Sequence, residues 1–75
     1  MADTLDSVKL LQALDTKIDI LDMQPDNLLA IARSIGIVEA KILVHAHNQN
    51  ALEASKCFDE IRTRTDKYQS ILRGE

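Results

Sequence analysis

The sequence predicts an all-α fold, a small three-helix antiparallel bundle in which residues 1–75 form a single helical domain. Apolar residues make up 45% of the chain, but only Phe58 and Tyr68 are aromatic, and such an aliphatic composition favours packed helices over a sheet. Two glycines and one proline leave few positions for tight hairpin turns. Apolar residues also recur at helical spacing in three segments, over about residues 4–22, 25–46 and 51–73.

The length of the chain makes an isolated fold marginal. A domain of this size buries only about 60% of the surface that its unfolded chain exposes. Cys57 is the only cysteine, so no disulfide can form within one chain. Small domains without a covalent support commonly gain stability from self-association or from a partner. Length and composition therefore favour a chain that binds a protein, a second copy of itself, or both.

The first helix is expected over about residues 4–22. Asp3 suits the N-cap position, because a short acidic side chain can accept hydrogen bonds from the free backbone N–H groups of the first turn. Ile20 lies outside the apolar arc of this helix. At helical pitch that arc spans about 100° and contains Leu10, Leu11, Leu14, Ile18 and Leu21.

The second helix is expected over about residues 25–46. Pro25 suits its first position, and Met23 and Leu28 have the spacing of a hydrophobic staple. Two apolar stripes run along different sides of this helix, and they consist of Leu28, Ile31, Ile35, Val38 and Ile42, and of Ile37, Ala40 and Val44. A helix that is apolar on two sides must be covered on two sides, which predicts that it lies between the other two.

The third helix is expected over about residues 51–73. The polar run from His45 to Asn50 is typical of a loop, and Asn50 with Glu53 has the spacing of a capping pair. The predicted seam of this helix has alternating three- and four-residue spacing and contains Ala51, Ala54, Phe58, Ile61, Thr65, Tyr68 and Leu72.

One alternative architecture stays open at this point. Ile37, Ala40, Val44 and His47 are in phase with the seam of the third helix. A single helix over about residues 37–73 would therefore also be periodic, with a length of about 55 Å. The chain would then be a short helical pair packed on one long C-terminal helix, and its function would be that of a structural coiled-coil subunit.

A second alternative rests on a resemblance. Residues 28–42 resemble the helix-turn-helix motif of DNA-binding proteins, with Gly36 at the turn position. The resemblance implies a DNA-binding regulator that uses residues 28–47. A recognition helix needs polar and basic residues towards the DNA, but here it would present Val38, Leu43 and Val44 with Lys41 as its only base. The net charge of −3 repels phosphates as well, so nucleic acid is not the expected partner.

The residues capable of chemistry do not form a recognisable site. His45 and His47 are two positions apart, so on a helix their side chains point about 200° apart and cannot hold one ion. Cys57 has no second thiol, and no glycine-rich loop could build an oxyanion site beside it. We therefore expect no enzyme, metal, cofactor or small-molecule substrate. Cys57 is expected to be a small buried residue and His45 to be solvated at a helix end.

The sequence also suggests a location. No stretch approaches the roughly 18 apolar residues of a membrane span, and the first residues are acidic where a secretory signal is basic. A single thiol suits a reducing compartment. These observations predict a cytoplasmic protein that does not bind a membrane.

The expected function is that of a small non-enzymatic protein–protein interaction module, namely an adaptor, regulator or inhibitor that presents an apolar helical face. Its partner is expected to be another protein or a second copy of the chain. Surplus apolar surface marks such contact sites, and aromatic side chains are favoured anchors in them. The expected contact residues are Val38, Leu43, Val44, Phe58, Tyr68 and Leu72.

Overall fold

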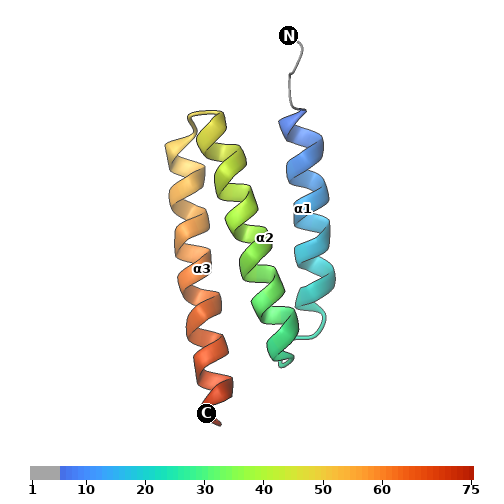
Figure 1. The fold of residues 1–75 in the computed structure, drawn as a ribbon, viewed down its shortest axis with the longest axis vertical. Coiled ribbons are helices and arrows are strands. Elements are labelled where there is room, and N and C mark those ends of the chain that lie inside the picture. Colours follow the sequence, from blue (N-terminus) through green and yellow to red (C-terminus); the bar gives the residue numbers. More distant parts are fainter. Residues whose placement is uncertain (1–5) are drawn as a thin grey trace.

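The computed structural model describes residues 6–75 and contains three α-helices (Figure 1). They are α1 (Ser7–Asp22), α2 (Leu28–His47) and α3 (Ala51–Leu72), and no strand occurs in this part of the chain. Successive helices run antiparallel, and each packs against the next along the chain. The predicted small all-α three-helix bundle is therefore confirmed.

The three helices lie side by side in one layer with α2 in the middle (Figure 1). Across the described residues, no Cα atom of α1 lies within 8 Å of a Cα atom of α3, whereas α2 packs against both helices. The Cα trace measures 50 × 22 × 12 Å, so the molecule is flattened. The prediction that the second helix lies between the other two is confirmed. The backbones of α1 and α3, however, do not meet to close the bundle.

A short Asp or Asn side chain caps the N-terminus of each helix. Asp6, Asn27 and Asn50 each accept a hydrogen bond from the backbone N–H three residues further on, at 3.2, 3.1 and 3.3 Å. The cap at Asn50 is the predicted one, and α3 begins at the expected residue. The expected cap Asp3 lies outside the described residues, and α1 begins at Ser7, later than expected.

The predicted start of the second helix at Pro25 is wrong. α2 begins at Leu28, because Asn27 has the short oxygen-bearing side chain that a cap requires. Pro25 lies in the turn between α1 and α2. The expected staple between Met23 and Leu28 fails for the same reason, since the helix starts three residues later and Met23 is exposed.

α2 is one uninterrupted helix. The helix-turn-helix alternative for residues 28–42 is therefore contradicted, because the chain makes no turn at Gly36. A helix tolerates an interior glycine at a modest cost, so a glycine alone does not break it. The DNA-binding alternative loses the geometry on which it was based.

The chain reverses direction between α2 and α3, at residues 48–50. Gln49 takes a φ of 57°, in the left-handed region that such a reversal uses. The alternative of one long helix over residues 37–73 is therefore wrong. The loop is shorter than predicted, because α2 continues to His47, and His45 is buried on α2 where a solvated side chain was expected.

The core lies where α2 meets both of its neighbours. Its buried residues come one from each helix, with partly buried residues packed around them: Ile18, Val38 and Cys57, and then Ile37, Ile42 and Ile61. The predicted apolar stripe of the first helix is half-buried or buried, and Ile20 is exposed outside it, as expected. Cys57 is a small buried residue, which confirms the prediction for this thiol.

The predicted seam of the third helix is partly wrong. Phe58 and Leu72 are 59% and 64% exposed, whereas Cys57 is buried and Ile71 is half-buried. Two apolar stripes overlap on α3. One runs through Phe58 and Leu72 and the other through Cys57 and Ile71, and Ile61 and Tyr68 belong to both. The periodicity of the sequence alone therefore does not show which stripe faces the core. Arg64 is seven residues from Cys57 and shares its side of the helix. The contacts that Arg64 makes to α1 and α2 orient this side towards the other helices.

Candidate interaction surface

The six predicted contact residues do not form one surface. Val38 and Val44 are 0% and 6% exposed, so the prediction that they contact a partner is wrong. Val38 packs with a residue of each neighbouring helix, because the part of α2 that carries it is covered from both sides. The other four residues reach the surface fully or in part, and they are Leu43, Phe58, Tyr68 and Leu72.

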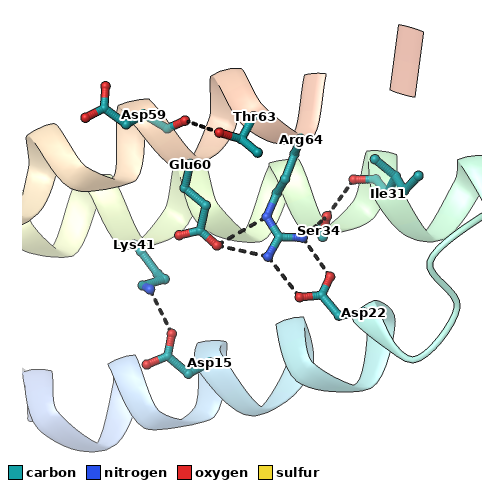
Figure 2. Close-up of polar contacts among 9 residues, drawn as sticks. All are labelled: Asp15, Asp22, Ile31, Ser34, Lys41, Asp59, Glu60, Thr63 and Arg64. Carbon is teal, nitrogen blue, oxygen red and sulfur yellow. Dashed lines mark hydrogen bonds and ion pairs between the residues drawn. The ribbon is translucent and has the colours of Figure 1, made fainter. Parts of the chain in front are cut away.

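A polar cluster centred on Arg64 occupies one face of the layer (Figure 2). Arg64 extends from α3 across α2 and donates hydrogen bonds to both carboxylate oxygens of Asp22 on α1, at 2.7 and 2.9 Å. It also donates to one oxygen of Glu60, at 2.9 and 3.2 Å, and to Oγ of the buried Ser34 at 3.0 Å. The Ser34 hydroxyl in turn donates to the carbonyl of Ile31 at 2.7 Å. We call Arg64, Asp22, Glu60 and Ser34 the Arg64 cluster, and its side of the layer the front face.

Charge and hydrogen bonding keep Asp22 and Arg64 ionised. The hydrogen bond from Arg64 holds the pKa of the Asp22 carboxyl below its ordinary value, against the opposing effect of burial. The same bond raises the pKa of Arg64. The Arg64 side chain is only 16% exposed, but that of Asp22 is 48% exposed, so solvent screens the pair. Because all three guanidinium nitrogens already have partners, the cluster connects the helices and is not a free binding site.

A second ion pair on the front face joins α2 to α1. The Lys41 ammonium lies 2.8 Å from a carboxylate oxygen of Asp15. Burial lowers the pKa of Lys41, but the hydrogen bond to Asp15 and nearby negative charge outweigh this effect, so the pKa is raised. The front face therefore holds charged contacts that stabilise the fold.

Burial raises the pKa of the Cys57 thiol, which keeps the thiol protonated and a poor nucleophile at neutral pH.

The opposite side of α2 carries exposed apolar residues, with the exposed Glu39 beside them. At 3.6 residues per turn, Leu29, Ala32, Gly36 and Leu43 lie about 140–180° around α2 from Ser34. All four are exposed, and the two leucine side chains are 63% and 72% exposed. Together with the two grooves beside them, these four residues make up what we call the back face.

Two apolar grooves flank this part of α2. The groove between α1 and α2 has a volume of about 400 Å³ and is lined by Lys17, Ile20, Leu21, Arg33, Gly36 and Ile37. The groove between α2 and α3 has a volume of about 370 Å³ and is lined by Ala32, Ile35, Thr65, Tyr68, Gln69 and Leu72. The second groove brings together two of the predicted contact residues, Tyr68 and Leu72. The α2 residues between the grooves are small, so another helix can approach α2 closely there.

Gly36 lies at the centre of the back face. A Cβ atom placed on Gly36 would have no neighbour within 4 Å, so no packing contact among the described residues requires a glycine at this position. A glycine in a helix interior costs about 1 kcal/mol relative to alanine. The fold of one chain does not account for this residue. Its missing side chain does, however, leave room for the backbone of a second helix.

Other kinds of site find little support in the described chain. No group of three His, Cys, Asp or Glu side chains within residues 6–75 is placed to hold a metal ion. None of the three helices combines the length and the apolar composition needed to cross a membrane. Comparisons with protein-family models, with curated proteins and with solved structures find no match.

The sequence reasoning missed most of the back face. The sequence places Ile35 in one of the two apolar stripes of the second helix and Ile20 outside the stripe of the first, and Leu29 is not among the predicted contact residues. A usable signal was present, because Leu29, Gly36 and Leu43 are spaced seven residues apart and so return to one side of the helix. That signal is hidden in the sequence, since α2 carries apolar residues around most of its circumference.

Proposed function

We propose that this chain is a non-enzymatic protein–protein interaction module that binds a helix of a protein partner on its back face. The observation that carries the proposal is the pair of apolar grooves on one side of the layer, separated only by the small residues of α2. Amphipathic helices bind by laying their apolar side chains into grooves of this kind. The proposal thus keeps the expected function and moves its site from the buried valines to the opposite side of α2.

The exposure of large apolar side chains supports this proposal. Leu29, Leu43 and Leu72 each keep more than half of their surface in water, although burial of a leucine side chain is worth about 1.5–3 kcal/mol. Scattered exposed apolar residues are common in proteins, but Leu72 lines one of the two grooves, and Leu29 and Leu43 lie on the same side of α2 as Gly36, which lines the other. A partner that covers the back face would remove them from water together.

The proposal also includes the cellular compartment in which the protein works. Cys57 is a free thiol, a state that the reducing cytoplasm maintains. The charged contacts of the front face connect the three helices. We therefore propose a cytoplasmic adaptor or regulator whose partner is a protein.

The proposal is tested by site-specific photo-crosslinking in cells that express the protein naturally. Leu43→benzoylphenylalanine and Leu72→benzoylphenylalanine place the reactive group on the back face, and Gln12→benzoylphenylalanine is the control, because Gln12 is exposed on α1 but lines neither groove. Irradiation is expected to yield a discrete protein adduct from positions 43 and 72 only. Adduct formation that is equal at Gln12, or absent at all three positions, would contradict the proposal.

A further inference from the structure

We infer that the back face binds a second copy of this chain, with the two α2 helices packed antiparallel across a twofold axis at Gly36. This inference rests on the proposed function and names its partner. It is carried by three features of α2, which are the spacing of the exposed leucines, the placement of two opposite charges and the unoccupied space at Gly36. Each feature is symmetric about the same residue.

The leucines supply the first argument. Leu29 and Leu43 each lie seven residues from Gly36, on opposite sides of it along the helix. When two α2 helices cross antiparallel at Gly36, Leu29 of one copy lies at the level of Leu43 of the other. A seven-residue spacing also keeps all three positions on one side of a pair of packed helices. The two exposed leucines of α2 are therefore placed to be covered by a second copy.

Charge supplies the second argument and also sets the direction. Arg33 and Glu39 lie three residues before and three residues after Gly36, both exposed. Neither forms an ion pair with another of the described residues. An antiparallel crossing brings Arg33 of one copy to the level of Glu39 of the second copy, about 4.5 Å along the axis from the crossing point. A parallel crossing would instead bring like charges together, so the charges favour the antiparallel arrangement.

The space at Gly36 supplies the third argument. Nothing within the described chain approaches the position where a side chain would stand. Ala32 and Ala40 lie four residues to either side, so small residues extend along the helix in both directions from the crossing point. Helix axes can approach to about 8 Å when the residues at the contact are small. The glycine that one chain leaves unexplained fits the crossing point of two chains.

The inference is tested by measuring the molar mass of the full chain by sedimentation equilibrium over a wide range of concentration. The monomer has a mass of 8.4 kDa, and the expected result is a reversible dimer of twice that mass. Leu43→Asp is expected to raise the dissociation constant at least about tenfold, because it places a charge in an apolar contact. Leu52→Asp is the matched control, since Leu52 is similarly exposed but lies on α3 outside both grooves, and its dissociation constant is expected to stay unchanged.

A charge exchange tests the direction of packing. Arg33→Glu is expected to weaken the dimer about tenfold, because it sets two acids against each other at both ends of the crossing. The double variant Arg33→Glu with Glu39→Arg is expected to restore the original dissociation constant. In a parallel dimer Arg33→Glu would only replace one pair of like charges by another and would leave the dissociation constant nearly unchanged, and that outcome would overturn the inference. Circular dichroism of each variant is the control that its helices are retained.

The failure of this inference can be distinguished from failure of the proposed function. A monomer at every concentration, or a dimer that Leu43→Asp leaves intact, overturns the second-copy inference. If the photo-crosslinks from Leu43 and Leu72 then identify a different protein, the proposed function stands with that partner. If the crosslinks are absent as well, both proposals fail.

Discussion

Arg64 on α3 binds both carboxylate oxygens of Asp22 on α1, at 2.7 and 2.9 Å, although the two helices have no Cα atoms within 8 Å of each other in the described chain. The long side chain of Arg64 and the carboxylate of Asp22 meet in front of α2, where Arg64 also contacts Ser34. This contact, with the Lys41–Asp15 pair, supplements the packing of α1 against α2. The front face is therefore specified by charged residues and the back face by apolar ones.

Removal of the Arg64 side chain is expected to destabilise the fold. Arg64→Ala deletes the hydrogen bonds to Asp22, Glu60 and Ser34, and the expected loss in free energy of unfolding is about 1–2 kcal/mol, since the carboxylates that lose their partner are partly hydrated. The measurement is urea unfolding followed by circular dichroism. Arg62→Ala is the control, because Arg62 is exposed, and its change is expected to stay within about 0.5 kcal/mol. Equal effects of the two variants would show that the cluster contributes nothing.

Acid is expected to weaken the connection between α1 and α3. The pKa of Asp22 is lower in the folded chain than its ordinary value of 3.8, so the ionised carboxylate stabilises the fold above that pH. This contribution to the free energy of unfolding declines once the pH falls below 3.8, and it is lost as the pH falls through the lowered pKa of Asp22. Asp22→Asn is expected to reduce the acid-dependent loss of stability, measured as the urea midpoint between pH 5 and pH 2. An unchanged pH profile in the variant would refute this role.

A matched pair of isoleucines on α1 tests which side of that helix forms the core. Ile18 is 5% exposed and Ile20 is 55% exposed, so the same substitution samples two environments. Ile18→Ala is expected to cost about 2–5 kcal/mol in free energy of unfolding, because it leaves a cavity. Ile20→Ala is expected to cost under about 1 kcal/mol at concentrations where the chain is monomeric. Thermal unfolding by calorimetry measures the loss for each variant. Comparable losses would contradict the burial of Ile18 and the exposure of Ile20 on α1.

Gly36→Ala is expected to stabilise the single chain. The added methyl group has no neighbour within 4 Å, and alanine favours a helix interior by about 1 kcal/mol over glycine. The midpoint of thermal unfolding at low protein concentration should therefore rise. Ala32→Gly is the reverse control on the same side of α2, and it should lower the midpoint. A decrease with Gly36→Ala would show that the fold of one chain needs the glycine.

The architecture could be predicted from sequence because each helix carries a strong local signal. The leucines and isoleucine of the first helix fall on a single arc, so the stripe and the exposure of Ile20 followed from periodicity alone. Asn50 marked the start of α3, because its short side chain carries an oxygen that can accept a hydrogen bond from a free N–H group of the first turn. The start of α2 was harder, since Pro25 and Asn27 are both acceptable near a helix terminus.

The site could not be predicted in the same way, because it depends on tertiary placement. α2 is apolar on most sides, so the sequence did not reveal that Val38 would be covered and Leu43 left exposed. On α3 the neighbours Cys57 and Phe58 offered two nearly equivalent stripes. The choice between them depends on Arg64, whose partner Asp22 is 42 residues away along the chain.

The position of α2 between its neighbours also determines how the structure can be assembled. α1 has no backbone contact with α3 in the described chain, so apart from the Arg64–Asp22 hydrogen bonds its packing depends on α2. α3 can pair with α2 without any help from α1. Loss of α1 would thus leave a helical hairpin, whereas melting of α2 would release both outer helices together.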